Sequence, residues 1–306
     1  MTSLPYLRVL TPGAFQGIVF VILGTATFST MHALVRFVSS DIPPFEVAFF
    51  RNLFGLLIFV PWLARNGLRV LHTNRIGMHA LRASLNSCSM LCWFTALALV
   101  PLAEATALSL MTPLFVAIGA SLYLRESVGF GRWMAVACGI VGTVVIMRPG
   151  VDAMSLGMLL VLASSVFATG SKIFAKELSD SDGAATIVAY VTLFMAPITL
   201  VPSLFVWVWP NLESLGWLML IGVLATTSHV LTIRAYKWFD ISLVEPFMFI
   251  RLAWAAGLGY LLFREVPALA TWIGAFVIAV GIAILAWSEY AAGQARRKAI
   301  AASPAD

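Results

Sequence analysis

Residues Ala96–Gly142 read ALALVPLAEATALSLMTPLFVAIGASLYLRESVGFGRWMAVACGIVG, two apolar runs joined by a short polar loop. The chain repeats this stretch, because adding 139 to a residue number often finds the same residue again. The matching pairs are Ala96/Ala235, Leu122/Leu261, Arg125/Arg264, Glu126/Glu265, Trp133/Trp272, Gly142/Gly281, Phe28/Phe167, Thr30/Thr169, Ser40/Ser179 and Asp41/Asp180. One offset that holds without a gap from Phe28 to Gly281 indicates an internal duplication.

The composition predicts an integral membrane protein. Hydrophobic residues make up 61% of the chain and charged residues 11%, with a mean hydropathy of +0.96. Soluble domains carry about 25% charged residues. The apolar runs are continuous and lack the alternation of a β-barrel. We therefore expect the partner of this surface to be the lipid bilayer. The net charge of +5 is explained by membrane orientation, so we expect no nucleic-acid partner.

A membrane-spanning helix needs about 20 mostly apolar residues. By this criterion the chain predicts an all-α membrane protein with ten transmembrane helices. They cover residues 15–37, 45–64, 76–98, 102–123, 131–147, 156–175, 184–206, 215–235, 242–262 and 268–287. Proline and charged residues mark most of the breaks between them.

The basic residues predict the orientation, because cytoplasmic loops are enriched in Lys and Arg. With the N-terminus inside, the cytoplasmic side carries Arg8, Arg65, Arg69, Arg75, Arg125, Arg132, Lys172, Lys176, Arg234, Lys237, Arg296, Arg297 and Lys298. The outer side carries Arg36, Arg148 and Arg264. Both termini are therefore predicted to be cytoplasmic.

The duplication then predicts two five-helix repeats of opposite orientation, because five is an odd number of crossings. The repeats cover residues 15–147 and 156–287, and residues 288–306 are expected to form a disordered cytoplasmic tail. Inverted repeats are typical of alternating-access carriers, whose substrate site lies near the middle of the membrane between the halves.

Charged residues inside membrane helices are costly and usually face the interior of the helix bundle. Arg51 lies about a third of the way into the second predicted helix, where it either reaches the outer interface or takes a buried structural or cavity role. Arg251 lies about ten residues into the ninth, about 15 Å deep, and is expected to line or brace a cavity, with a purely structural role as the alternative.

Polar residues also follow one face of the third and first predicted helices. On the third helix this stripe consists of His79, Arg82, Asn86, Ser89 or Met90, and Trp93. On the first it consists of Thr25, Ser29, His32 and Arg36. Each stripe indicates either a cavity or a helix contact. His79 and Arg82 are near the cytoplasmic end and could serve as anchors there, so Asn86 and Trp93 are the stronger cavity candidates.

Three titratable residues are candidates for coupling transport to protons: Glu104, Glu245 and His229. Both glutamates lie near helix N-termini, where the helix dipole favours a carboxylate anyway. Thr112-Pro113 predicts a kink in the fourth helix, because proline removes a backbone hydrogen bond. Gly139 and Gly142, with Gly274 and Gly281 in the second repeat, predict close helix contact and no chemistry.

The sequence gives no sign of an enzyme or of a bound cofactor. It contains neither a phosphate-binding GxxxxGK[ST] motif nor a zinc-binding HExxH motif. No catalytic Ser/His/Asp set follows from the spacing. Cys88, Cys92 and Cys138 all lie in apolar runs and are expected to pack as small apolar residues, with no metal site or disulfide.

Three stretches resemble the drug/metabolite transporter superfamily, in its EamA branch. They are PPFEVAFFRNLFGLL (43–57), ALALVPLAEATALSLMTPLFVAIGASLYLRE (96–126) and AYKWFDISLVEPFMFIRLAWAAGLGYLLFRE (235–265), and the resemblance extends over about residues 15–287. It implies a multi-pass secondary carrier of the bacterial inner membrane with a central cavity. By position, the resemblance implies that the cavity residues are His32, Asn86, Trp93, Thr112, His229, Arg251 and Trp254.

Such carriers move small-molecule solutes. Arg51, Arg82 and Arg251 outnumber the buried acids Glu104 and Glu245. This balance, with tryptophans available for stacking, predicts an anionic or zwitterionic solute such as an amino acid, S-adenosylmethionine or riboflavin. A multidrug or metabolite exporter of the same fold is the alternative. A membrane enzyme or scaffold would need a nucleophile and base, or large loops. A homodimer is compatible with the sequence, which leaves the oligomeric state open.

Overall fold

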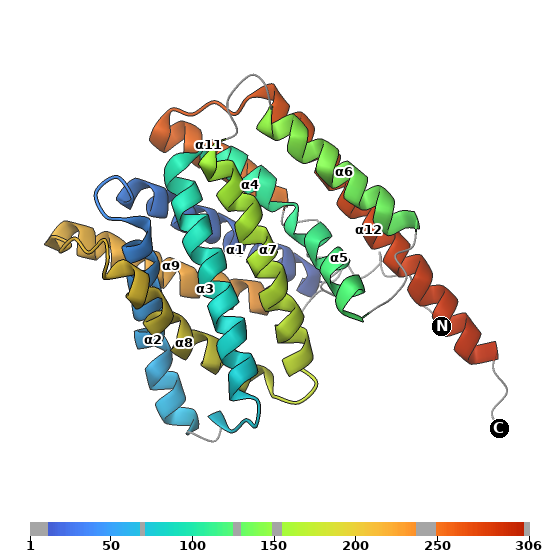
Figure 1. The fold of residues 1–306 in the computed structure, drawn as a ribbon, viewed down its shortest axis with the longest axis horizontal. Coiled ribbons are helices and arrows are strands. Elements are labelled where there is room, and N and C mark those ends of the chain that lie inside the picture. Colours follow the sequence, from blue (N-terminus) through green and yellow to red (C-terminus); the bar gives the residue numbers. More distant parts are fainter. Residues whose placement is uncertain (1–11, 68–70, 125–129, 149–154, 237–248, 303–306) are drawn as a thin grey trace.

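The computed structural model describes residues 12–67, 71–124, 130–148, 155–236 and 249–302, which form helices and their connections (Figure 1). The helices are α1 (Pro12–Val38), α2 (Pro44–Asn66), α3 (Ile76–Leu99), α4 (Leu102–Ser109), α5 (Thr112–Leu124), α6 (Phe130–Met147), α7 (Leu156–Leu178), α8 (Ala184–Ser203), α9 (Leu212–Tyr236), α11 (Ile250–Phe263) and α12 (Leu269–Ala302). Most predicted spans agree with these bounds to within about three residues. Residues 242–248 of the ninth span lie outside the described residues.

The predicted kink divides the fourth span into α4 and α5, which are separated by Leu110 and Met111. Pro113 has no N–H with which to bond the carbonyl of Ser109 one turn earlier. The hydroxyl of Thr112 donates to this carbonyl instead, at 2.8 Å. The break is therefore stabilised by the residue next to the proline, a common solution inside membranes.

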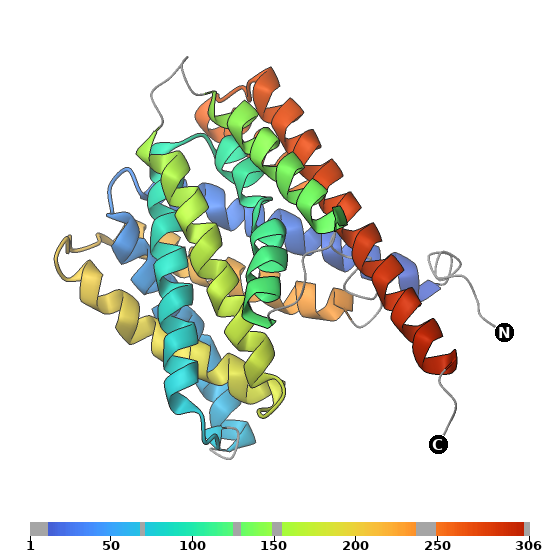
Figure 2. The same ribbon diagram turned by 45° about the vertical axis from the view of Figure 1, so that its right-hand side comes forward.

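The prediction of a disordered tail is wrong for most of its length. Helix α12 continues through the end of the tenth predicted span as far as Ala302 (Figure 2). The sequence of this extension explains its structure, because EYAAGQARRKAIAA contains no proline and is rich in alanine, the best helix former.

The chain is a multi-pass membrane protein. Within the described residues, seven helical stretches are long and apolar enough to cross a membrane: Gln16–Val38, Pro44–Arg65, Leu102–Gly119, Leu156–Leu178, Thr186–Ser203, Leu212–Thr232 and Leu269–Ser288. Trp133–Met147 and Ile250–Phe263 are shorter apolar helices. Helix α3 does not reach this hydropathy because it carries the polar stripe, and it packs against α7, α8, α2 and α1.

The helix contacts follow the sequence repeat. The offset of the repeat makes α1 equivalent to α7, α2 to α8, α3 to α9 and α6 to α12. Helix α1 packs on α9, and the equivalent pair is α7 on α3; likewise α2 packs on α9 as α8 packs on α3. Helices α2 and α8 pack on each other, as do α6 and α12, which lie side by side in both views (Figures 1 and 2). Exchanging the two repeats leaves this set of contacts unchanged, which is the property of a twofold axis. The inverted repeat predicts such an axis.

Glycines bring α6 and α12 together, as predicted. A Cβ atom on Gly142 would lie 2.6 Å from the carbonyl oxygen of Gly274, and one on Gly274 would lie 2.5 Å from that of Gly142. The repeat maps this contact onto Gly281 and Ala135, where a Cβ on Gly281 would lie 2.9 Å from the carbonyl oxygen of Ala135. Because no side chain fits between these backbones, the two helices pack at the close distance that small residues permit.

Among the described residues, ion pairs between the two repeats occur at two separate positions. Arg36, at the end of α1, pairs with Glu265 just after α11, and Glu265 also accepts from the backbone N–H of Leu102 at the start of α4. At the start of α3, His79 contacts Asp182, 2.7 Å away in the connection between α7 and α8. Arg75 pairs with Glu177 at 2.5 Å. Both sets connect a first-repeat helix with second-repeat residues.

Candidate substrate-binding cavity

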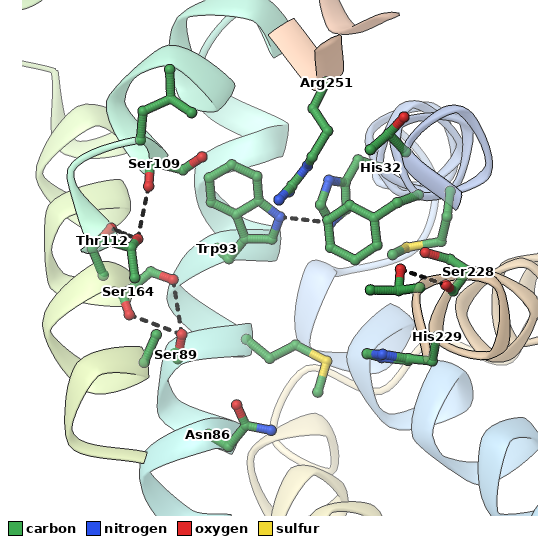
Figure 3. A pocket seen from close by; sticks show the side chains of 18 of the residues that line it. His32, Asn86, Ser89, Trp93, Ser109, Thr112, Ser164, Ser228, His229 and Arg251 are labelled. Carbon is green, nitrogen blue, oxygen red and sulfur yellow. Dashed lines mark hydrogen bonds between the residues drawn. The ribbon is translucent and has the colours of Figure 1, made fainter. Parts of the chain in front are cut away.

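A cavity of about 510 Å³ lies between the two repeats. Its lining residues come from the middle of the spanning helices of both halves (Figure 3). Cavities that hold small metabolites typically measure about 300–1,000 Å³. The cavity therefore lies where the inverted repeat predicts it, and its volume is typical of a site for a small metabolite.

Six of the seven predicted substrate residues line this cavity: His32, Asn86, Trp93, Thr112, His229 and Arg251. Arg51, predicted as a buried charge, lines it as well. Trp254 is not among the lining residues, and its side chain is 37% exposed. A step of three residues turns it by about 60° from the direction of Arg251, enough to leave the cavity face of α11.

Arg82 and Glu104, two other predicted residues, are not among the lining residues. Arg82 donates to the carbonyl of Ile187 at 3.0 Å, so it connects α3 with α8. Glu104 lies in the first turn of α4, and its Oε1 atom is 3.8 Å from Nη2 of Arg148. Glu245 lies outside the described residues. The polar stripe on α3 therefore has two parts. Asn86 and Trp93 line the cavity, and Arg82 lies nearer the start of the helix and contacts α8.

An aromatic cluster forms one part of the cavity wall. The indole N–H of Trp93 donates to Nε2 of His32 at 3.0 Å. The His32 ring lies edge-on to Phe28, with 4.2 Å between the ring centroids. Arg251 reaches down from α11, and its guanidinium lies 4.3 Å from the centroid of the Phe28 ring, a cation–π distance (Figure 3). A flat ring entering this region would meet aromatic faces beside a cation.

Hydroxyl groups form the wall provided by α3, α5 and α7. The Ser89 hydroxyl lies 3.0 Å from that of Ser164 and donates to the Ser164 carbonyl at 2.9 Å. The Thr112 hydroxyl lies 3.1 Å from that of Ser165 (Figure 3). These neutral groups both donate and accept, and suit a solute with several polar atoms.

A basic cluster lies where α2 meets α9. Nη1 of Arg51 donates to Oδ1 of Asn52 at 2.9 Å, and Nη2 lies 3.4 Å from Nε2 of His229. The amide of Asn52 donates in turn to the Thr199 hydroxyl at 3.2 Å. Asn52 and Thr199 are both buried, so the guanidinium is held by a chain of hydrogen bonds that reaches α8.

The cavity carries positive charge. Of the lining residues that the structure describes, Arg51, Lys172 and Arg251 are cationic and none is a carboxylate. Membrane interiors give such charges little solvation, so they favour a partner of opposite charge or a strong hydrogen-bond acceptor. The electrostatics therefore suit an anionic, zwitterionic or carbonyl-rich solute better than a simple cation.

The cavity is symmetric in position and asymmetric in chemistry. Both members of several repeat pairs line it: Thr25/Ser164, Ser89/Ser228, Met90/His229, Trp93/Thr232, Leu110/Phe249 and Thr112/Arg251. The last pair places a neutral hydroxyl in one half and a cation in the other. The chemical asymmetry of the cavity therefore comes from positions at which the two repeats differ.

Sequence reasoning missed Phe28, Ser164 and Ser228 as cavity residues, and it did not pair Arg51 with His229. The repeat itself contained a usable signal. Adding 139 to the predicted Ser89 gives Ser228. The Arg51–His229 contact had no such signal, because it joins two positions without equivalent partners in the other repeat.

Comparisons with known proteins agree with the fold and the cavity. The model of the EamA-like transporter family matches residues 15–148 and again residues 155–287. A riboflavin transporter of Vibrio cholerae is 32% identical over 276 residues, which cover 88% of this chain and 92% of that protein. The pseudopaline exporter CntI of Pseudomonas aeruginosa is 30% identical, covering 87% of this chain and 94% of its own.

Further similarities point the same way. An S-adenosylmethionine uptake transporter of Rickettsia bellii is 26% identical, covering 89% of this chain and 94% of its own. One crystal structure superposes on 88% of this chain and 96% of its own with a TM-score of 0.61 and 16% identity, a likeness of fold alone. The chain therefore belongs to the EamA-like transporter family, carries the family domain twice, and is a transporter of small metabolites of the drug/metabolite type.

Proposed function

We propose that this transporter carries a small metabolite with a flat ring and an anionic, zwitterionic or carbonyl-rich character, by alternating access across the bacterial inner membrane. The observation that carries the proposal is the position of Arg251 and Phe28 beside the Trp93–His32 pair, opposite a wall of hydroxyl groups. Aromatic rings stack on flat solutes, and a guanidinium binds carbonyl or carboxylate oxygens.

Riboflavin is the first solute to test. Its ring system presents carbonyl oxygens that suit Arg251, and its ribityl chain carries hydroxyls that suit Ser89, Ser164 and Thr112. A relative that is 32% identical is a riboflavin transporter. The wall that faces Arg251 would then bind the chain while the aromatic cluster binds the ring.

Alternating access would proceed by rocking of the two repeats about the cavity. The twofold arrangement supports this, because an inverted repeat gives two related conformations that open on opposite sides. The distribution of Lys and Arg supports cytoplasmic termini. Relatives named as uptake transporters and as an exporter are equally compatible with this scheme, so the direction is set by the coupling.

The test is transport by the purified protein in liposomes, with labelled riboflavin, S-adenosylmethionine, tryptophan and tetraphenylphosphonium supplied separately. Riboflavin is expected to enter with saturable kinetics. The Arg251→Ala variant is expected to raise the apparent KM at least about tenfold, since a hydrogen bond to a charged group contributes about 1.5–3 kcal/mol. Arg65→Ala removes an exposed charge at the end of α2 and serves as the matched control.

Robust transport of tetraphenylphosphonium, with none of the other three solutes transported, would contradict the proposal. Equal loss of transport for all solutes in Arg251→Ala, at normal protein levels in the liposomes, would assign Arg251 a structural role instead.

A further inference from the structure

The contact between Arg51 and His229 joins the two repeats inside the cavity. Arg51 belongs to α2 of the first repeat and His229 to α9 of the second, and both residues line the cavity. The repeat offset places Tyr190 at the position equivalent to Arg51 and Met90 at the position equivalent to His229. This polar contact therefore has no counterpart in the other half of the molecule.

The hydrogen-bonding capacity of Arg51 is only partly used by the described residues. One Nη atom donates to Asn52 and the other approaches His229. The Nε–H is buried and has no partner among the described atoms. The Asn52–Thr199 chain fixes the guanidinium from one side. A guanidinium held in this way is prepared to accept an anionic group in its planar fork.

The contact also defines the state of His229. A guanidinium remains protonated and can only donate, so the Nε2 atom of His229 that it faces must carry a lone pair. The ring is then neutral, with its hydrogen on Nδ1. Adding a proton at Nε2 would place two cations 3.4 Å apart. Inside the membrane, where charges are poorly screened, such a pair is strongly unfavourable.

The groups around His229 do not relieve this conflict. Helix α9 packs on α1 and α2. The titratable or charged cavity residues on these helices are His32 and Arg51, and Arg251 and Lys172 are the other cations that line the cavity. Among the described lining residues no carboxylate is present to balance a protonated His229. An anionic group on the solute would supply the balancing charge.

We propose that Arg51 and His229 couple solute binding to proton binding: an anionic group of the solute binds Arg51, and His229 then takes up a proton. The bound anion accepts hydrogen bonds from Nη2 and Nε of Arg51, and Nη2 then no longer donates to the imidazole of His229. The freed Nε2 lone pair forms an N–H bond with a proton delivered by hydronium from the solution on the side to which the cavity is open, and neutral water is left behind. One negative and one positive charge enter together, so the cavity gains no net charge.

This coupling gives the carrier a driving force. By thermodynamic linkage, the anion favours protonation of His229 and the protonated ring favours the anion by the same factor. A proton gradient across the membrane then drives the anionic solute in the same direction as the proton. The contact crosses between the repeats, so rocking of the halves can make and break it during the cycle. The inference rests on the proposed solute class, but its first test needs no solute.

The first measurement is the nitrogen NMR spectrum of the purified full-length protein labelled with ¹⁵N-histidine. The chain has only four histidines, so His229→Gln assigns the resonance. At pH 6 the wild-type His229 ring is expected to be neutral, with hydrogen on Nδ1. In Arg51→Gln, which lacks the opposing cation, the same ring is expected to become protonated at a higher pH than in wild type when spectra are recorded at successively lower pH. Arg82→Gln is the control, because Arg82 is a half-buried arginine that contacts α8 instead.

The second measurement records proton movement into liposomes that contain pyranine, after addition of riboflavin 5′-phosphate as an anionic flavin. Wild-type protein is expected to acidify the interior in proportion to the flavin taken up. In His229→Gln, whose amide cannot titrate, the ratio of protons to flavin is expected to fall to background. His72→Gln, the same change at an exposed histidine, is expected to keep the wild-type ratio.

A protonated His229 ring in the wild-type protein at pH 6 without solute, or protonation of the ring at the same pH in wild type and Arg51→Gln, would overturn the proposal. So would an unchanged ratio of protons to flavin in His229→Gln. If no flavin is transported at all, the proposed solute class fails, while the NMR comparison of wild type with Arg51→Gln still tests the coupling pair. His229→Asn provides a second non-titrating variant if His229→Gln does not fold.

Discussion

The chemistry of the cavity is concentrated in single residues that depend on their neighbours. Trp93 can only donate through its indole N–H, so His32 accepts at Nε2 and carries its hydrogen on Nδ1. This hydrogen bond holds the indole plane in the wall of the cavity. The guanidinium of Arg251 in turn lies over the ring of Phe28. Each group that faces the solute is therefore oriented by a second group behind it.

Replacing Trp93 by Phe tests this arrangement at the residue scale. The variant keeps an aromatic ring but leaves Nε2 of the buried His32 without its donor. The hydrogen bond that fixes the aromatic ring in the wall contributes about 0.5–1.5 kcal/mol. Without it the ring has to be ordered when the solute binds, so the Kd for riboflavin is expected to rise up to about tenfold. Quenching of flavin fluorescence on binding to the purified protein measures this. Trp287→Phe, at a 75% exposed indole, is the control, and equal effects of both substitutions would contradict the account.

At the scale of single residues, the sequence predicted which polar residues face the cavity better than it predicted their partners. Residues His32, Asn86 and Trp93 were found because a 3.6-residue period places each on one face of its helix. Trp254 was implied only by position in the family resemblance, and it does not line the cavity, because the angular width of a cavity on α11 is not encoded in that helix alone. The Arg51–His229 pair joins residues 178 positions apart, and no local pattern predicts such a contact.

At the scale of elements, the start of α3 differs chemically from its repeat equivalent, the start of α9. The start of α3 is anchored by His79, whose ring is fully buried, stacks on Tyr190 and contacts Asp182. The repeat equivalent of His79 is Leu218 on α9, which is also fully buried. An apolar contact in one half thus corresponds to a polar contact in the other, so the two ends of the molecule need not open with equal ease.

Asp182 provides a stability test of this polar anchor. Burial acts to raise the pKa of its carboxyl, but hydrogen bonds from His79 and Thr73 and the charges of His79 and Arg75 outweigh burial and lower the pKa below its ordinary value. A carboxyl with a lowered pKa contributes stability above its unfolded pKa of about 3.9. This contribution is present at neutral pH and is lost as the pH falls through the still lower folded value.

The Asp182→Asn variant is therefore expected to be less stable than wild type at pH 7, by about 1–3 kcal/mol. Its melting temperature in detergent should be lower at neutral pH, and the difference should shrink below about pH 4, where the wild-type carboxyl also becomes neutral. Asp180→Asn changes an exposed carboxylate two residues away and should melt like wild type. Identical melting of Asp182→Asn and wild type at pH 7 would show that the anchor contributes nothing.

The sequence predicted the elements well where one residue type decides the local structure. Thr112 and Pro113 predicted the break between α4 and α5, and Gly142, Gly274 and Gly281 predicted the close packing of α6 and α12, because proline and glycine act locally. The prediction of a disordered tail after the tenth span was wrong, because the loss of apolar residues there does not end helix α12. Helix propensity continues beyond that point, and the backbone follows it to Ala302.

At the scale of the whole molecule, duplication explains both the architecture and the site. The repeat fixes which helices contact each other, and the contacts exchange the halves as a twofold axis requires. The cavity lies where the halves meet. Sequence alone could predict this location, because an odd number of helices in each repeat forces inversion. It could not predict the solute, which depends on how side chains from ten of the described helices meet in space.

The central claim is that the solute binds in the cavity between the repeats, with its ring against Phe28 and Trp93 and an oxygen on Arg251. The most direct test is a cryo-EM structure of the full-length protein saturated with riboflavin. The account predicts density for the flavin ring beside these two aromatic side chains, and contact between the guanidinium and a ring carbonyl. Flavin density at any other position, or a cavity without flavin at saturating concentration, would contradict it.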